Sequence, residues 1–325
     1  MRLNLSSFLQ MRFNFYLIRK MGWDLTYLYI HLLGKLYFFF KRKEQRQIAQ
    51  SLQSVFSDRK DPLEIKSLKK AVYRGIIAHY YEKIFNAFSP PETLRYFFEN
   101  NFEIKGRGSL DETLAAGRGV LLVTGHFGGV EYIPLYLGFK KYPVSMVVKF
   151  SSEKLRSMSL AQAAAFGVEV IDPDRTPNVM KAIINSLKKN RIVITQCDEI
   201  DEWRLSRQDK IFFLGKQTFQ DKTLNVLLKR AAAPVVFAVM NRNGNQRYKF
   251  IATSWESMSR QFQRSVQTTA GEVLLKFLER YIYIHPEEWY QWKKYPAIET
   301  VPAAVTSAQE TSPVSFMEPS LGKAL

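Results

Sequence analysis

The sequence predicts an α/β domain with a mixed central sheet flanked by helices, preceded by an N-terminal helical segment. From residue 102 onward, short apolar runs alternate with helical stretches, which is the pattern of α/β domains. Hydrophobic residues make up 46% of the 325 residues, enough to build a sizeable core. One largely apolar run, residues 119–124, leads directly into a glycine-lined turn, as a buried strand of such a sheet does.

The elements follow in chain order. A long amphipathic helix is predicted from Asp61, with Pro62 as a natural first helical residue, to the break at Ser89-Pro90-Pro91. Later helices are expected at or near residues 110–116, 152–166, 177–189, 220–232 and 266–284. Strands are expected at residues 102–105, 119–124, 144–148, 168–171, 191–196, 211–214, 234–240 and 247–253. This order predicts the α/β class, and no internal repeat is visible.

Residues 22–40 form an apolar segment that is long enough, as a helix, to approach the roughly 30 Å of a bilayer core. Asp24, His31 and Lys35 fall on one stripe of that helix, which favours a position in the membrane interface over a clean crossing. Basic residues at 41–43 stand where a signal peptide would have its cleavage site. The alternative is a buried aromatic helix of the domain itself.

Three regions follow from these patterns. We expect an amphipathic, membrane-associated segment at residues 1–44, a folded domain at 45–296 and a tail at 297–325. The tail is rich in Ala, Ser, Thr, Glu and Pro, a composition that predicts disorder.

The formal net charge of +17 favours an anionic partner, and a merely solvated basic surface is the alternative. Nucleic acid, an anionic membrane surface and an acidic carrier protein all fit, and charge alone does not choose among them. The single cysteine, Cys197, excludes an internal disulfide and a thiolate zinc cluster. A lone cysteine at the end of an apolar strand is better explained as a small core residue than as a nucleophile. A reducing, cytosolic environment is therefore the default expectation.

The sequence GHFGGVE at residues 125–131 carries the most chemical information. It follows a predicted strand, and ligands of open α/β sheets bind at the carboxyl ends of strands. His126 and Glu131 would point about 140° apart on one helix, so they can meet only across the turn. There the carboxylate could hold one imidazole nitrogen and leave the other as a base. The alternative is a structural histidine beside an ordinary helix-terminal acid. The absence of a second nearby histidine argues against a metal site.

This pattern resembles the lysophospholipid acyltransferase superfamily, and GHFGGVE looks like its lipid A (lauroyl/myristoyl) branch. The similarity extends over roughly residues 45–296. The further residues that carry it are Gly117 to Leu122 before the motif, Asp198 after a strand, Phe213-Leu214-Gly215-Lys216 with Thr218, Ala233-Pro234-Val235 and Pro286-Glu287-Glu288-Trp289-Tyr290. The resemblance implies a glycerolipid acyltransferase-like fold and an acyltransferase domain at residues 45–296.

The resemblance also implies an activity: transfer of an acyl chain from acyl carrier protein or coenzyme A to a hydroxyl of a lipid A precursor or related glycolipid. His126 would be the general base, and Glu131 would orient it. No cofactor is implied, because the thioester donor is already activated. The expected location is the cytoplasmic face of a bacterial inner membrane, with the protein either peripheral or crossing the membrane once.

Further site residues are expected around this pair. Asp198 could assist His126 or position substrate. Gly128 and Gly129 could let backbone amides or substrate approach closely. Lys149 stands where the branch commonly has Arg, and it lacks the planar fork of that residue. Lys216 belongs to a set of basic residues that could attract anionic headgroups or the carrier.

Three departures from the branch leave the acceptor open. This chain has Gly129-Val130 for Asn-Trp, Lys149 for Arg, and Asp198-Glu199 for Asp-Gln. A lysophospholipid or another lipid hydroxyl would suit the same catalytic pair. Acyl length, donor and oligomeric state are also not determined by the sequence.

Two other classes of protein fit parts of the sequence. A non-catalytic basic protein that binds membrane or nucleic acid would explain the charge. It would leave the His126 motif unexplained, and nucleic acid is not expected because its recognition motifs are missing. A dinucleotide-binding enzyme is excluded, since Asp111 stands where the glycine fingerprint of Gly106 and Gly108 needs its third glycine.

Overall fold

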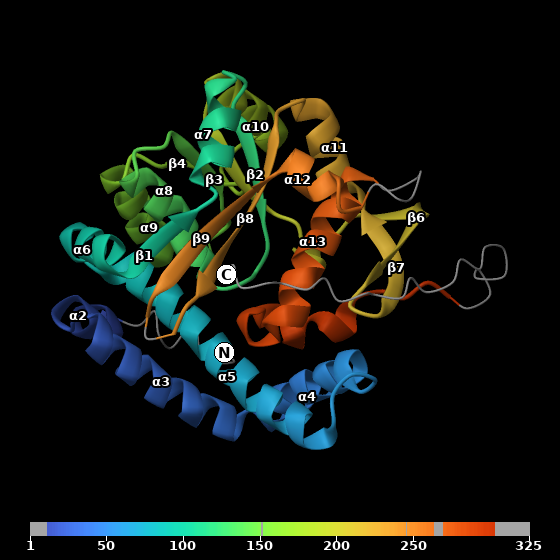
Figure 1. The fold of residues 1–325 in the computed structure, drawn as a ribbon. Coiled ribbons are helices and arrows are strands. Elements are labelled where there is room, and N and C mark those ends of the chain that lie inside the picture. The colour runs from blue at the N-terminus through green and yellow to red at the C-terminus, as the bar shows by residue number, and fades with distance from the viewer. Residues whose placement is uncertain (1–11, 151, 245, 263–268, 303–325) are drawn as a thin grey trace.

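The computed structural model describes residues 12–150, 152–244, 246–262 and 269–302. A twisted central sheet lies between two layers of helices, and α2 to α5 form one end of the molecule (Figure 1). The predicted α/β class with a mixed central sheet flanked by helices is confirmed. The predicted boundary between residues 44 and 45 falls inside α4 (Arg42–Phe56).

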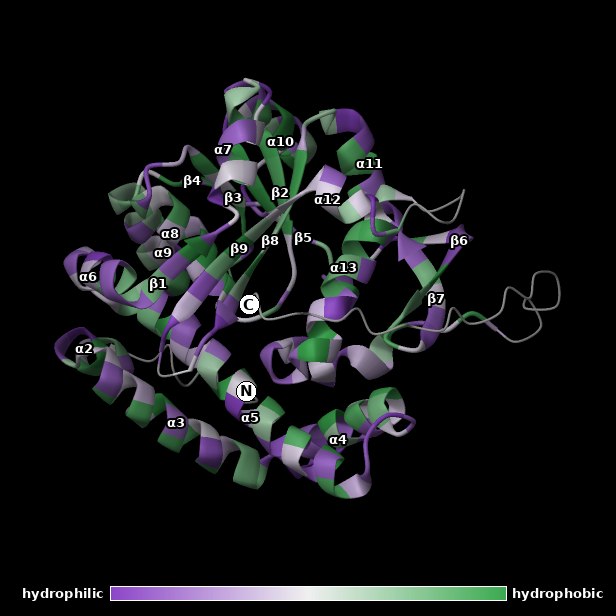
Figure 2. Cartoon of the chain, viewed as in Figure 1, coloured by the Kyte–Doolittle hydropathy of each residue, from purple (hydrophilic) through white to green (hydrophobic). Residues whose placement is uncertain are grey.

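The main sheet has seven strands in the order β1-β9-β8-β2-β5-β3-β4. Its five strands from β8 to β4 are parallel, β9 is antiparallel to β8, and β1 is parallel to β9. The strands are β1 (Phe102–Lys105), β2 (Val120–Thr124), β3 (Val144–Val147), β4 (Glu169–Ile171), β5 (Ile192–Gln196), β8 (Val235–Arg242) and β9 (Tyr248–Ser254). All five residues of β2 are buried, as expected for a central strand covered on both faces. Figure 2 shows the hydrophobic residues concentrated in β2, β5 and β8.

A separate two-stranded hairpin corrects the predicted strand at residues 211–214. It consists of β6 (Leu205–Phe213) and β7 (Lys216–Asp221), joined by a turn in which Leu214 and Gly215 have positive φ. Much of β6 is polar and exposed, so apolar periodicity reveals only its last residues. β7 was not predicted at all.

Each predicted helical segment corresponds to a helix, whereas the helices at residues 12–20, 42–56, 91–101 and 255–259 were not predicted. They are α2 (Arg12–Lys20), α3 (Trp23–Phe40), α4 (Arg42–Phe56), α5 (Pro62–Phe88), α6 (Pro91–Asn101), α7 (Arg107–Ala115), α8 (Ile133–Phe139), α9 (Glu153–Ala165), α10 (Val179–Lys188), α11 (Lys222–Ala231), α12 (Trp255–Ser259) and α13 (Ala270–Ile284). Short 3₁₀ turns complete the chain at η1 (Val130–Tyr132), η2 (Ile200–Glu202), η3 (Pro286–Glu288), η4 (Tyr290–Lys293) and η5 (Tyr295–Ala297). The first part of the predicted final helix, 263–268, lies outside the described residues.

The long helix α5 begins where the sequence predicts. Asp61 accepts hydrogen bonds from the backbone of Leu63 and Glu64, and the Glu64 side chain accepts from the Asp61 backbone, so both halves of a capping box are present. Buried residues occur around most of its circumference, because it lies between the N-terminal helices and the body of the domain (Figure 1). It therefore forms a support between the N-terminal helices and the rest of the domain.

Helix α3 has two apolar faces with different surroundings. Thr26, Ile30, Gly34 and Phe38 face inward and are buried, and an added Cβ at Gly34 would lie 2.6 Å from Ile77 on α5. Glycine thus permits close helix contact here. The outer face leaves 51 to 74% of each large apolar side chain exposed, at Leu25, Leu28, Leu32, Leu36, Phe39 and Phe40. Among the described residues, no helix combines the length and the apolar character needed to cross a bilayer.

The predicted tail is ordered where it begins. Ile298 and Val301 are buried, and the Val301 N–H donates to the Gln217 carbonyl of β7. These contacts correct the prediction of disorder for residues 297–302. The remainder of the predicted tail, residues 303–325, lies outside the described residues.

Candidate active site

Two neighbouring strands bring the first two site residues together. β2 and β5 are parallel and paired up to Thr124 and Gln196, so the residues that follow them meet at the same sheet edge. His126 follows β2 and Asp198 follows β5. The imidazole Nδ1 of His126 lies 2.9 Å from Oδ1 of Asp198, and these two residues form the centre of the site.

Asp198 is completely buried and fully engaged. Its two carboxylate oxygens accept the backbone N–H of His126 at 2.9 and 3.0 Å, and Oδ2 accepts Nε1–H of Trp289 at 2.7 Å. Burial would raise the pKa of Asp198, but the imidazole of His126 and these hydrogen bonds hold it below its usual value. A charged Asp198 therefore fixes the position of the histidine and, when the ring is neutral, keeps its proton on Nδ1.

The other imidazole nitrogen faces a second carboxylate. Nε2 of His126 lies 2.7 Å from Oε1 of Glu199, whose side chain is 39% exposed. Burial alone would lower the pKa of His126, but Asp198 and Glu199 together raise it to about 9. At neutral pH the histidine is thus an imidazolium that donates from both nitrogens. Glu199 occupies the position from which Nε2 would receive a proton.

Glu131 does not orient His126 in this structure, so the predicted pairing is not confirmed. Its carboxylate lies 3.7 Å from Nε2 of His79 and 4.0 Å from Nζ of Lys83, both on α5. Within the described residues it forms no hydrogen bond or ion pair with His126. The side chain of Asn86 donates to the Glu131 carbonyl, which fixes the turn η1 against α5. The carboxylate at Nδ1 of His126 belongs to Asp198 instead.

An aromatic contact connects the two halves of the motif indirectly. The ring of Tyr290 packs edge-on to His126 with centroids 5.1 Å apart, and it stacks on His79 at 3.5 Å. Burial, reinforced by Lys83 and Arg242, lowers the pKa of His79 well below its usual value, so this ring is neutral. His79 lies within the predicted long helix, and nothing in the helical pattern reveals its place between Glu131 and Tyr290.

The glycines of the motif allow backbone segments to approach closely. Gly128 has φ of +59°, and an added Cβ would lie 1.9 Å from the Met240 carbonyl oxygen. Its N–H donates to the Glu288 carbonyl, and that of Gly129 donates to Met240. Both amides already have acceptors within the chain. The predicted role of these glycines in admitting substrate stays a prediction, and their amides are not free donors in this state.

Comparison with known proteins identifies the family of the chain. The chain matches the family model of bacterial lipid A biosynthesis acyltransferases over residues 7–294. The chain belongs to this family. Its members transfer acyl groups, so this protein is an acyltransferase, as the resemblance implied. The match begins well before residue 45 and includes the N-terminal helices. No curated protein matches the chain.

Acyltransferases of this family do not need a cofactor. In the described ranges, no group of three or more His, Cys, Asp or Glu side chains is arranged to hold a metal ion. Cys197 is buried beside the site, and burial raises the pKa of its thiol well above the usual value. A thiol in that state is a poor nucleophile, which agrees with its prediction as a core residue.

The two predicted basic site residues of the acyltransferase have other contacts. Lys149 is exposed and lies 3.8 Å from the exposed carboxylate of Asp174. Nζ of Lys216 donates to the carbonyls of Tyr295 and Ile298 at 3.0 and 3.4 Å, and it lies over the Tyr295 ring. Lys216 thus connects residues 295–298 to the hairpin. A role for either lysine in substrate binding stays a prediction.

A buried ion pair under the motif was missed by sequence reasoning. Arg242 at the end of β8 binds Glu82 of α5 through two bonds, of 2.6 Å from Nε and 2.9 Å from Nη2. Nη2 also donates to the Gly128 carbonyl at 2.8 Å. Glu82 is completely buried, and burial raises its pKa although Arg242 opposes that effect. The sequence feature that could have indicated this pair is Glu82, an acidic residue at a buried position of a long helix.

This ion pair leads to a stability prediction. Replacing Arg242 with methionine leaves the Glu82 carboxylate buried without its counterion, so we expect the free energy of unfolding to fall by about 3 to 5 kcal/mol. Urea denaturation of the purified variant measures this loss. The Glu82→Leu/Arg242→Met double variant should recover most of it, because the uncompensated charge is gone. A double variant that is less stable than Arg242→Met would contradict this account.

Proposed function

We propose that the protein moves a fatty acyl chain from acyl carrier protein or acyl coenzyme A to a hydroxyl of a lipid A precursor or related glycolipid. The observation that carries this proposal is the His126–Asp198 pair at the carboxyl edge of the sheet. A histidine held at one nitrogen by a carboxylate can remove a proton from an alcohol with its other nitrogen. Family membership supplies the class of reaction, acyl transfer.

The proposed reaction is direct. Nε2 of His126 takes the proton of the acceptor hydroxyl while Nδ1–H stays bound to Asp198. The hydroxyl oxygen attacks the thioester carbonyl, and the tetrahedral intermediate collapses with loss of the thiolate. The imidazolium then returns its proton to the departing sulfur. No acyl-enzyme is needed, because the thioester is already activated. For the base to act, the imidazolium must first give its Nε2 proton to Glu199 or to solvent, and Glu199 must then leave Nε2 when the acceptor arrives.

We also propose that the enzyme works at the cytoplasmic face of a bacterial inner membrane, with α3 lying along the membrane surface. The inner face of α3 is already buried against α5, and its outer face presents the apolar stripe of Leu25, Leu28, Leu32, Leu36, Phe39 and Phe40. An amphipathic helix of this kind inserts its apolar face at the headgroup boundary, with cations beside it. The formal charge of +17 suits an anionic leaflet.

An acyl-transfer assay tests the proposed activity. Purified protein in detergent is offered labelled acyl carrier protein or acyl coenzyme A together with one of several acceptors: a lipid A precursor, another glycolipid, or a lysophospholipid. We expect transfer to a glycolipid hydroxyl that is absent in the His126→Ala variant. Transfer only to lysophospholipid would change the acceptor and retain the chemistry. An inert parent, or an active His126→Ala variant, would favour a non-catalytic basic membrane protein.

A further inference from the structure

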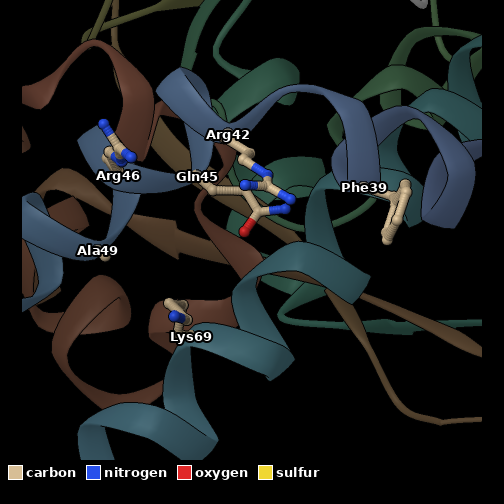
Figure 3. A pocket seen from close by; sticks show the side chains of 6 residues that line it. All are labelled: Phe39, Arg42, Gln45, Arg46, Ala49 and Lys69. Atoms are coloured by element: carbon tan, nitrogen blue, oxygen red, sulfur yellow. The ribbon is translucent and has the colours of Figure 1, made fainter.

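A basic hollow opens at the junction of the first helices. Its volume is about 350 Å³, and it lies between the end of α3, one face of α4 and the facing part of α5 (Figure 3). The residues that line it are Phe39, Arg42, Gln45, Arg46, Ala49 and Lys69. The four residues from α4 follow helical spacing, so they share one face, and the small Ala49 leaves room beside the longer side chains. The hollow is thus formed by the fold of all three helices.

Three cations line the hollow. Arg42 and Arg46 stand four residues apart on α4, where like charges destabilise a helix by a few tenths of a kcal/mol. Lys69 adds a third positive charge from α5. Within the described ranges, none of the three forms an ion pair. A local excess of positive charge of this kind attracts anions.

The nearest acidic residue of α4 is already in use. Glu44 accepts a hydrogen bond from the Tyr37 hydroxyl at 2.9 Å and lies 3.5 Å from Nζ of Lys293. Its carboxylate therefore does not neutralise the hollow. The site retains a local excess of positive charge that an external anion can satisfy.

The hollow adjoins the apolar stripe of α3. Phe39 belongs to both, with 66% of its surface exposed, and the neighbouring Phe40 is 74% exposed. Aromatic side chains settle at the boundary between acyl chains and headgroups, and cations settle at the level of the phosphates. If α3 lies along the membrane, the same contact brings Arg42, Arg46 and Lys69 to the depth of the lipid phosphates.

We propose that this hollow binds the phosphate headgroup of an anionic membrane phospholipid and so sets the orientation of the enzyme on the membrane. This inference rests on the membrane docking proposed for α3. It concerns a lipid of the bilayer, not the acyl acceptor at His126. The cavity has the size of a small-ligand site, whereas an acidic helix of a carrier protein, about 10 Å wide, would lie across it without entering. A carrier would also leave the exposed Phe39 and Phe40 unexplained.

The test compares two triple variants of the full chain. The first, Arg42→Gln/Arg46→Gln/Lys69→Gln, removes the cations of the hollow. The matched control, Lys181→Gln/Lys188→Gln/Arg230→Gln, makes the same change in net charge around a second hollow of about 320 Å³. That hollow lies by α10 and α11, at the opposite end of the molecule from α3 and α4 (Figure 1).

Binding is measured by co-sedimentation with vesicles of phosphatidylcholine alone and with vesicles that also contain phosphatidylglycerol. At low salt, we expect the first variant to lose roughly fivefold in affinity for the anionic vesicles per cation, or about 100-fold in all. The control variant should lose far less. On phosphatidylcholine alone the first variant should bind like the parent, because the apolar stripe is unchanged.

Three results would overturn the proposal. Equal losses in the two triple variants would mean that only total charge matters. Unchanged binding to anionic vesicles would remove the headgroup site, and if binding of acyl carrier protein fell instead, the hollow would be a carrier-docking surface. A parent that binds neither vesicle would refute membrane docking as well. The detergent assay of acyl transfer is independent of vesicles, so failure of the catalytic proposal remains distinguishable.

Discussion

The Asp198→Asn variant is expected to lower kcat for acyl transfer by on the order of 10³-fold. Asp198 holds Nδ1 of His126, and an asparagine cannot stabilise the imidazolium that forms during the reaction or guarantee that Nδ1 carries the proton. It would also direct an amide donor toward the N–H groups of His126 and Trp289, both of which now donate to the carboxylate. Steady-state kinetics with the His126→Ala variant as the reference for full loss measures the effect.

Glu131→Gln is the informative comparison for this prediction. Its carboxylate contacts His79 and Lys83, so we expect a much smaller loss of kcat than in Asp198→Asn. The melting temperatures of both variants show whether a loss of activity comes from impaired catalysis or from unfolding. A Glu131 variant that is as inactive as Asp198→Asn, with an intact fold, would contradict the assignment of Asp198 as the principal orienting residue.

The Glu199→Gln variant is expected to shift the pH dependence of kcat/KM toward lower pH. In the parent, burial lowers the pKa of His126 but Asp198 and Glu199 raise it to about 9, and the base is active only when it is neutral. Activity of the parent should therefore rise as pH increases toward 9. Removing the Glu199 charge removes one cause of the raised pKa. The pKa of His126 should then fall by on the order of one unit, as expected for the loss of a close ion pair. The rising part of the curve of kcat/KM against pH should shift to lower pH by the same amount.

The effect at neutral pH follows from the same shift. Each unit by which the pKa of His126 falls increases its neutral fraction at pH 7 about tenfold, so kcat/KM at pH 7 should rise in the Glu199 variant. Glu202→Gln is the matched control, because this exposed residue of η2 makes the same change in net charge. A profile of Glu199→Gln that coincides with the profiles of the parent and the control would show that Glu199 does not govern the titration of His126.

The elements that depend on local information were predictable from the sequence. The start of α5 is determined within four residues by Asp61, Pro62 and Glu64, and the buried run of β2 identifies itself by composition. The position of His126 at a strand end is likewise local. The hairpin strand β7 was missed because neither its polarity nor its period distinguishes it from a loop.

The family, the α/β class and His126 were thus determined by the sequence alone, whereas the partners of His126 were decided by the tertiary structure. Asp198 lies 72 positions away in the chain and meets His126 only because β2 and β5 are neighbours in the sheet. The Arg242–Glu82 pair likewise forms only when the end of β8 meets α5. Periodicity reports which face of an element is apolar, but the strand order that places two distant polar side chains in contact depends on how the whole core is buried.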